Sequence, residues 1–256
     1  MQGRVSPDGK LLAVSLVKRE NGDLTKHPRL EVIDQEGNRR KIAEDADVIA
    51  WSPDSQKILC RRGKNYGWSH CLVDLQNGQE TALPIEPKDA VMDWSPDGNA
   101  LGVMKGRPDS LWKRGPDDFY PKRQLYFAAL TSGQPKAPFT DAEEDCIWWR
   151  YSSAGKQGVY YRRHYATGRP VETAMIADAD GRNPNQLIDF TALGVRPGGS
   201  PCWSPDETQL LWQVTREPSE ERIEYELMFV PLGEKKPRSV TADSLGLESF
   251  GRIDWR

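Results

Sequence analysis

The sequence predicts an all-β fold, a single β-propeller of about five four-stranded blades, and three observations favour this prediction. An aromatic-Ser-Pro-Asp motif followed by a short apolar run recurs along the whole chain. Successive copies lie 43 to 57 residues apart, which is the size of one blade with loop insertions. The 19 prolines and 22 glycines divide the chain at regular intervals, and helical periodicity is not sustained over a full window.

Each copy of the motif joins the first two of four strands, which we name A to D. Strand A ends on the aromatic residue. The Ser-Pro-Asp-Gly element then makes a tight turn, because proline fixes φ, the Asp side chain bonds nearby backbone and glycine tolerates positive φ. The copies read Val5-Ser6-Pro7-Asp8-Gly9, Trp51-Ser52-Pro53-Asp54, Trp94-Ser95-Pro96-Asp97-Gly98, the degenerate Tyr151-Ser152-Ser153-Ala154-Gly155, and Trp203-Ser204-Pro205-Asp206.

Strand B is the apolar run after the turn, and strand C is a second apolar run beyond a polar stretch of variable length. A Gly-bearing turn follows each strand C and leads into a short strand D. The predicted B strands are 11–14, 57–60, 101–104, 159–161 and 210–212, the C strands are 30–33, 71–74, 125–128, 174–177 and 227–230, and the D strands end near residues 42, 83, 139, 187 and 240.

We expect one domain over residues 1–256. The segment from Phe250 to Trp255 repeats strand A with no blade after it, whereas the N-terminus has only a stub before its first turn. A closing strand over 250–256 that completes the first blade would remove an exposed sheet edge. Six blades is the alternative, if one blade lies outside this sequence. The predicted blades are approximately 1–46, 47–90, 91–145, 146–199 and 200–249.

The composition is typical of a soluble globular protein. Charges of both signs are mixed, the formal net charge is −3, and no window approaches the roughly 18 apolar residues of a membrane helix. We therefore expect no nucleic-acid partner, no direct membrane insertion and a monomer. The cysteines form no CxxC pair, which argues against structural zinc. Cys60 and Cys71 flank one predicted hairpin, either as a cross-strand disulfide or as two half-buried thiols.

The turn at Trp94-Ser95-Pro96-Asp97-Gly98, followed by an apolar strand, resembles the WD-like repeat of TolB-like β-propellers. The resemblance spans essentially the whole chain, and related blades occur in the N-terminal propellers of prolyl-oligopeptidase-type enzymes. It implies a protein-binding role in the bacterial envelope and hence a periplasmic or extracytoplasmic location. The sequence departs from the pattern in its fourth copy, which lacks Pro-Asp, in its blade count, since the best-known relatives have six, and in having no N-terminal domain of the TolB kind.

The segments between strands B and C are long and rich in Arg, Lys and aromatic residues, whereas the opposite turns are short and uniform. Function usually resides in the variable loops of a rigid scaffold, and aromatic and Arg residues are enriched at binding hot spots. The longest of these segments, 105–123, carries three aromatic residues. We therefore predict a non-catalytic scaffold for a protein or peptide partner, with binding residues Arg61, Arg62, Trp68, Trp112, Arg114, Phe119, Tyr120, Arg162, Arg163 and Tyr165.

The alternative is a carbohydrate- or small-ligand-binding propeller, or a metal-dependent lyase or hydrolase, with its site over an axial channel. Charged residues on the A strands are the channel candidates. The three histidines fall between strands B and C of different blades and are the ligands that such a cation would take. No catalytic residue and no cofactor is predicted otherwise, since the string Gly67-Trp68-Ser69-His70-Cys71 lacks the final glycine of a nucleophile elbow. The channel candidates are Asp93, Arg150, Arg252 and Asp254, and the histidines are His27, His70 and His164.

A third hypothesis is an interaction domain of a larger receptor or kinase chain.

Overall fold

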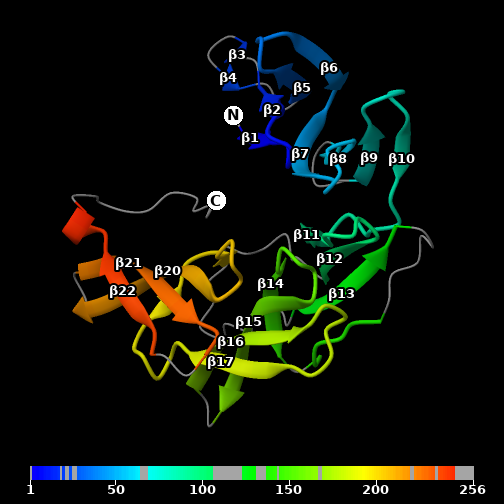
Figure 1. Cartoon of the computed structure of the whole chain (residues 1–256). Helices are drawn as coiled ribbons and strands as arrows, with labels where there is room; N and C mark the ends of the chain where they lie inside the picture. The colour runs from blue at the N-terminus through cyan, green and yellow to red at the C-terminus, as the bar shows by residue number, and fades with distance from the viewer. Residues whose placement is uncertain are drawn as a thin grey trace. The chain divides into compact units, whose positions relative to one another are not determined.

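The computed structural model of the chain consists of antiparallel strands and, among the described residues, one short 3-10 helix (Figure 1). No helix in that part of the chain has the length and apolar character needed to cross a bilayer. The chain divides into two compact units, one formed by Met1–Gly115 with Phe127–Lys136 and the other by Pro116–Tyr126 with Ala137–Arg256. The structure describes residues 2–17, 19–20, 23–24, 28–63, 69–105, 123–130, 137–142, 144–166, 169–219, 222–233 and 236–245.

The first unit contains two four-stranded sheets and most of a third sheet, which has three described strands. The boundary between the units falls within the last of these strands, β13. Each sheet is one predicted blade, and a two-stranded ribbon of β3 and β4 interrupts the first. The strands are β1 (Gln2–Val5), β2 (Leu11–Leu16), β3 (Arg19–Glu20), β4 (Asp23–Leu24), β5 (Arg29–Asp34), β6 (Arg39–Ala43), β7 (Ala46–Trp51), β8 (Lys57–Arg62), β9 (Ser69–Asp74), β10 (Glu80–Ala82), β11 (Ala90–Trp94), β12 (Ala100–Lys105) and β13 (Gln124–Ala129).

The second unit contains the fourth and fifth blades. The fourth is a four-stranded sheet in chain order, and the fifth has five strands because its strand A is split in two. The elements are β14 (Asp145–Tyr151), β15 (Gln157–Ala166), β16 (Arg169–Asp178), β17 (Asn185–Asp189), β18 (Arg196–Pro197), β19 (Cys202–Trp203), β20 (Gln209–Ser219), β21 (Arg222–Pro231), β22 (Arg238–Thr241) and the 3-10 helix η1 (Asp243–Leu245).

Strand A of three blades carries a β-bulge shortly before its aromatic residue. The register shifts at Ile49 in β7, at Met92 in β11, and across Trp148 and Trp149 in β14. Trp148 has a φ of 64°, which is uncommon for a residue other than glycine. A bulge bends its strand and changes the direction of the neighbouring side chains. In these three strands, the bulge therefore affects the side chain that directly precedes the aromatic residue.

The Ser-Pro-Asp turns share one hydrogen-bond pattern. In the second blade the Ser52 hydroxyl donates to Asp54 Oδ1 at 2.6 Å, and that carboxylate accepts from the Gln56 amide at 3.0 Å. Ser52 Oγ also accepts from the Lys57 amide at 2.8 Å, which fixes the start of β8. The predicted turn is therefore confirmed, and the Ser–Asp bond recurs at 2.6 Å in the pairs Ser6–Asp8, Ser95–Asp97 and Ser204–Asp206.

In two of the repeats, the tryptophan of the motif joins its blade to the preceding one. The indole Nε1 of Trp51 donates to the Arg4 carbonyl of the preceding blade at 2.8 Å. In the second unit, Trp203 Nε1 donates to the Arg150 carbonyl in the same way, at 3.2 Å. Both acceptors lie one residue before the aromatic position of their own repeat, so the contact is a repeated feature of the fold.

Strand side chains form the core of each unit. In the second unit, Trp149 is fully buried, and its ring lies edge-on to Phe139 and Tyr151 at centroid distances of 5.2 and 5.3 Å. Gly158 leaves the space that this indole occupies. The core cluster of the first unit consists of Ala13, Leu30, Val32, Ala43, Ala46, Val48, Trp51, Ile58, Cys60, Cys71, Val73 and Leu75.

The all-β prediction and the five sheets are confirmed, with two differences of detail. The predicted N-terminal stub is a full strand, since β1 pairs with β2 from Gln2↔Ser15 to Val5↔Leu12 and gives the first blade its own strand A. Strand A of the fifth blade is interrupted by the Gly-Gly-Ser-Pro segment 198–201. The register of strand A with β20 therefore omits positions 212 and 213. The predicted closing strand, 250–256, lies outside the described residues, and the single-domain assignment stays a prediction.

Candidate functional site

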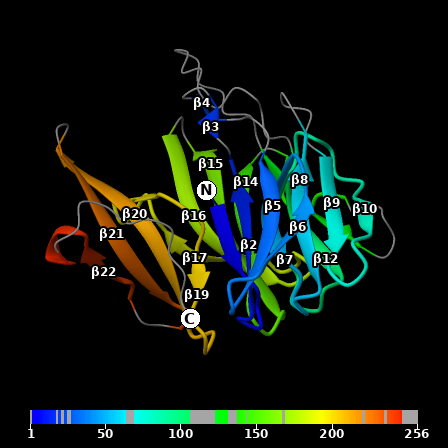
Figure 2. The ribbon, with the colours of Figure 1, turned by 90° about the horizontal axis from the view of Figure 1, so that it is seen from above.

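Among the described residues, the B and C strands of the fourth and fifth blades are longer than those of the first three. Strands β15 and β16 have ten residues each, and β20 and β21 have eleven and ten, whereas the B and C strands of the first three blades have six. Four extra residues lengthen a strand by about 13 Å. In the second unit, therefore, two paired hairpins extend the blades at the end opposite the Ser-Pro-Asp turns (Figure 2). This end is the one predicted to carry function.

A pocket of about 470 Å³ lies at this end of the second unit, between the two long hairpins. We call it the hairpin-end pocket. Its walls come from β15, β16, β18, β20 and the segment that follows β17. The lining residues are Arg163, Pro170, Glu172, Thr191, Gly194, Val195, Arg196, Thr215 and Glu217.

One wall of the hairpin-end pocket holds a partly buried ion pair. Arg163 Nε and Nη2 both donate to Glu172 Oε1, at 3.0 and 2.7 Å, and the Glu172 residue is only 8% exposed. The Arg163 guanidinium also lies 5.7 Å from the centre of the Tyr161 ring. The Glu172 amide donates to Thr191 Oγ1 at 2.8 Å, which ties the segment after β17 to the hairpin. The hydrogen bonds of Arg163, Glu172 and Thr191 therefore fix the positions of these side chains in the wall.

The pair Arg196–Glu217 occupies the opposite wall and is exposed. Arg196 Nη1 lies 3.3 Å from Glu217 Oε1, with the two side chains 69% and 48% exposed. An ion pair so exposed to solvent contributes little to stability, and its charges are free to exchange partners. Beneath it, Arg216 holds the backbone in place by donating to the Leu193 carbonyl at 2.9 Å and to Glu226 Oε1 at 2.7 Å.

A row of charged residues connects the hairpin-end pocket to the predicted binding segment 105–123. Arg123, the last residue of that segment, donates to Asp145 from Nε at 2.6 Å and from Nη2 at 2.5 Å. Both side chains are largely buried. Asp145 is paired with Arg163 in the β14–β15 register. The structure thus fixes the end of the longest predicted segment beside the pocket wall.

The other predicted arginines that the structure describes have carboxylate partners within their own blade. Arg61 lies 3.5 Å from Asp47, Arg62 lies 2.7 Å from Glu80, and Arg162 lies 3.4 Å from Glu144. They lie within strands β8 and β15 and not in the segments between strands B and C where they were predicted. Of the predicted arginines, only Arg163 lines the hairpin-end pocket among the described residues. Trp68, Trp112, Arg114, Phe119, Tyr120 and the side chain of Tyr165 lie outside the described residues.

Two of the three histidines, His70 and His164, lie within strands and not in the segments between strands B and C where the sequence predicts them. His70 is the second residue of β9, is 3% exposed, and has a pKa below its usual value, first because burial disfavours the charged ring and then because Arg61 is near. His164 lies within β15. The prediction was wrong because the strands run further toward this end than their apolar runs indicate. His27 lies outside the described residues, which contain no group of three or more metal-ligating side chains arranged to hold an ion.

The channel candidates Asp93 and Arg150 lie on strands β11 and β14, as predicted, each next to a bulge. Arg150 Nε donates to Ser200 Oγ of the following blade at 2.7 Å. Arg252 and Asp254 lie outside the described residues. The channel site stays a prediction.

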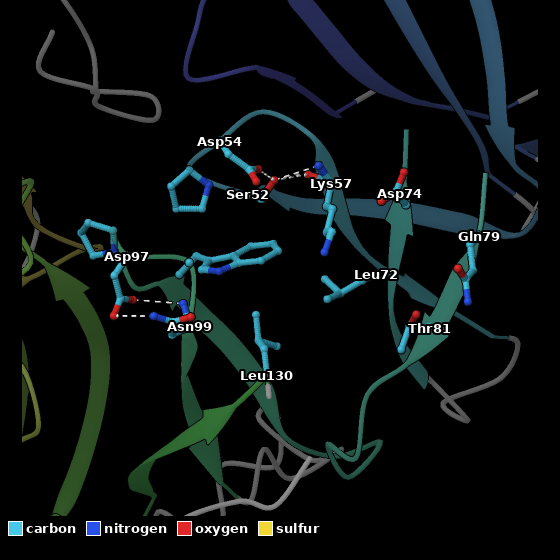
Figure 3. Close-up of a pocket in the computed structure, with 14 residues that line it drawn as sticks. Ser52, Asp54, Lys57, Leu72, Asp74, Gln79, Thr81, Asp97, Asn99 and Leu130 are labelled. Carbon is cyan, nitrogen blue, oxygen red and sulfur yellow. Dashed lines mark hydrogen bonds between the residues drawn. The ribbon is translucent and has the colours of Figure 1, made fainter. Parts of the chain in front are cut away.

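A second cleft, of about 660 Å³, lies in the first unit at the Ser-Pro-Asp-turn end of the second and third blades (Figure 3). We call it the turn-end cleft. Two of its carboxylates accept hydrogen bonds within their own turns. Asp54 accepts from the Ser52 hydroxyl, and Asp97 accepts from the Ser95 hydroxyl and from the amide and side chain of Asn99. The structure therefore supports the assignment of these aspartates to turn formation. The remaining labelled lining residues are Lys57, Leu72, Asp74, Gln79, Thr81 and Leu130.

Sequence reasoning missed most of the hairpin-end pocket. Glu172, Thr191, Arg196 and Glu217 were not among the predicted residues. The Arg163–Glu172 pair depends on the register of the β15–β16 hairpin, and the sequence alone does not determine that register. Arg196 and Glu217 come from different strands of the fifth blade. The available signal was the alternation of basic and acidic residues along the strand ends, which is compatible with many pairings.

No protein-family model matches the sequence, and no curated protein matches it either. Solved structures do match. TolB from Acinetobacter baumannii aligns over 94% of this chain with a TM-score of 0.61 and 18% identity. The β-propeller domain of the Trilobed protease from Pyrococcus furiosus aligns over 94% with a TM-score of 0.63 and 16% identity. Oligogalacturonate lyase from Vibrio parahaemolyticus aligns over 93% with a TM-score of 0.65 and 12% identity.

This chain spans only part of those proteins, namely 54% of the TolB chain, 69% of the protease propeller chain and 64% of the lyase chain. Three proteins named for different roles match it about equally well, at identities that carry information on fold alone. Together with the five antiparallel sheets, these similarities show that the chain has a β-propeller fold, structurally similar to TolB-like and peptidase propeller domains.

Proposed function

We propose that this chain is a non-catalytic propeller scaffold that binds a protein or peptide partner at the end of the blades carrying the long B–C hairpins. One observation carries the proposal: the hairpin-end pocket lies between the extended β15–β16 and β20–β21 hairpins and combines a rigid wall with an exposed, exchangeable ion pair. Functional residues concentrate where variable segments project from a rigid scaffold.

The chemistry of the pocket suits an extended peptide. Arg196 and Glu217 offer one donor group and one acceptor group of opposite charge at the mouth, and the hydroxyls of Thr191 and Thr215 offer neutral hydrogen bonds. Because Arg163 is already bonded to Glu172, the inner wall contributes shape and little net charge. A segment of mixed charge therefore fits this pocket better than a polyanion does.

The predicted binding segment adds to the same site. Arg123, the last residue of segment 105–123, is bonded to Asp145 beside the pocket wall. From the sequence, we include the aromatic residues of that segment, Trp112, Phe119 and Tyr120, in the proposed binding surface. Aromatic anchors beside a polar rim are the usual composition of a protein-binding surface. The likeness of the repeat to TolB-like propellers, a protein-binding group, supports the proposal.

The experiment first selects peptides that bind the chain and then uses variants to locate their binding site. A phage-displayed library of random linear peptides is selected on the purified chain, and binding of the enriched peptides is measured by fluorescence anisotropy. We expect Arg196→Glu and Trp112→Ala each to weaken binding by about tenfold, which corresponds to about 1.4 kcal/mol. The matched control is Lys57→Glu, which reverses an exposed cation in the turn-end cleft and should leave the Kd unchanged.

Two results would contradict the proposal. One is a selection that enriches no peptide. The other is a peptide whose binding is lost in Lys57→Glu and kept in both hairpin-end variants, which would move the site to the turn-end cleft.

A further inference from the structure

Two cysteines face each other across the central strands of the second blade. Cys60 in β8 and Cys71 in β9 are direct register partners, and their Sγ atoms lie 3.0 Å apart. Both are buried, at 0% and 6% exposure, and both are free thiols in this structure. Directly opposite residues of antiparallel strands have Cα atoms about 4.5 to 5.5 Å apart, within the range that a disulfide bridges. The backbone is thus already arranged for a cross-link.

The pKa values of the two thiols are shifted in opposite directions. The hydrogen bond from Cys60 holds the pKa of the Cys71 thiol below its usual range, and the same contact, followed by burial, raises the pKa of Cys60. Cys71 is therefore the sulfur that loses its proton first and the nucleophile of the pair. The buried thiol Cys146 behaves differently, because burial raises its pKa and disfavours the thiolate.

We propose that Cys60 and Cys71 form a redox-active dithiol site, which closes to a disulfide by exchange with a low-molecular-weight disulfide such as oxidised glutathione and reopens with excess thiol. The Cys71 thiolate attacks one sulfur of the oxidant, and the first glutathione leaves as a thiolate. Cys60 then loses its proton and attacks the Cys71 sulfur of the mixed disulfide, and the second glutathione leaves. Two protein thiols are oxidised, one external disulfide is reduced, and the two protons pass to the two released thiols.

The cross-link would act on the predicted binding end of the second blade. It joins β8 to β9 two residue pairs from the Arg62↔Ser69 pair, where the described part of the hairpin ends. A closed disulfide prevents this end of the hairpin from opening, whereas the dithiol permits local opening. Access of the oxidant to Cys71 requires the same opening, so exchange is expected to be slow in the folded protein.

The test uses the whole chain. The protein is equilibrated in a series of reduced-to-oxidised glutathione ratios, quenched with acid, alkylated, digested and mapped by mass spectrometry. We expect a peptide pair linked through Cys60 and Cys71 that increases with the oxidised fraction and disappears in dithiothreitol. The variants Cys60→Ala and Cys71→Ala should lose the linked pair, while Cys146→Ala and Cys202→Ala should retain it.

Three outcomes would overturn the proposal. They are full alkylation of Cys60 and Cys71 at every ratio, glutathione retained on Cys71 without closure, and a disulfide that instead involves Cys146 or Cys202. The mapping is made on the unmodified chain, so a variant that fails to fold leaves the result intact. Because peptide binding is not part of the readout, failure here is distinguishable from failure of the proposed function.

Discussion

Glu207 Oε1 accepts a hydrogen bond from the Ser153 hydroxyl at 2.5 Å and another from the Ala154 amide, and so joins the turns of the fifth and fourth blades. The first two blades have the same link, since Ser55 Oγ accepts from the Asp8 amide at 3.2 Å. Glu207 and Ser55 occupy the turn position that is glycine in the other three copies, and both have positive φ, 55° and 61°. The cost of a non-glycine residue at this backbone geometry is offset because its side chain accepts hydrogen bonds from the turn of the preceding blade.

The first prediction concerns Glu207. We expect Glu207→Ala to lower the free energy of unfolding by about 1 kcal/mol, because it removes the acceptor while leaving a non-glycine residue at positive φ. Glu207→Gln keeps a side-chain carbonyl oxygen and should lose much less. Urea denaturation of the three proteins measures the difference, and an unchanged free energy of unfolding in Glu207→Ala would show that the link to Ser153 contributes nothing.

The second prediction compares two tryptophans at the same repeat position. Trp51 Nε1 is bonded to the Arg4 carbonyl, whereas Trp94 Nε1 is buried with no acceptor among the described residues. Trp51→Phe should therefore cost about 1 kcal/mol more than Trp94→Phe, since the two changes remove similar apolar area but only the first breaks a hydrogen bond. The urea midpoints of the two variants decide this, and a larger loss in Trp94→Phe would contradict it.

The third prediction tests the packing of Trp149. A Cβ added at Gly158 would lie 1.9 Å from the indole of Trp149, which is fully buried. We expect Gly158→Ala to lower stability by about 3 kcal/mol through overpacking. Gly98→Ala is the matched control: it has open space and a φ of 76°, so it should cost only about 1 kcal/mol. Thermal unfolding of both variants measures the difference between their stability losses. Equal losses would contradict the prediction, because they would show that the indole moves aside freely.

The fourth prediction concerns acid sensitivity. Hydrogen bonds from the motif serines hold the pKa values of Asp8, Asp54, Asp97 and Asp206 below the usual aspartate range, and the bond from the fourth turn does the same for Glu207. Because these folded-state pKa values lie below the unfolded values of about 4, the unfolded chain binds more protons in that interval. The stabilisation is complete above about pH 5 and is lost as the pH falls through 4 toward the folded-state values.

Urea unfolding between about pH 7 and pH 3 checks this prediction. Asp54→Asn removes one of these groups, so its stability should fall less steeply with acid than that of the unchanged chain. A stability that stays flat down to pH 3, or an unchanged slope in Asp54→Asn, would contradict the assignment.

The repeat in the sequence was sufficient to predict the strands and the Ser-Pro-Asp turns because both depend on short-range chemistry. The Ser52–Asp54 bond spans two residues, and strand B begins a few residues later. The degenerate fourth turn, in contrast, is completed by Glu207, 53 residues beyond Ala154. Nothing local to Ala154 indicates that partner.

The ends of the long strands and the pocket could not be predicted for a related reason. His164 lies in a strand because β15 and β16 pair through Ala166↔Arg169, well beyond the apolar run that marked strand B. Polar residues extend a hairpin when cross-strand ion pairs such as Arg163–Glu172 support them, and such pairs are defined only by register. The predicted binding segments and the hairpin-end pocket lie toward the same end of the blades, while the residues of the pocket walls depend on this register.

The most direct test of peptide binding at the hairpin end is hydrogen exchange, followed by mass spectrometry, of the chain with and without a selected peptide. The account predicts slower amide exchange in the B–C ends of β15, β16, β20 and β21 and in segment 105–123, with the Ser-Pro-Asp turns unchanged. Protection confined to the turns around Asp54 and Asp97, with both long hairpins unaffected, would contradict it.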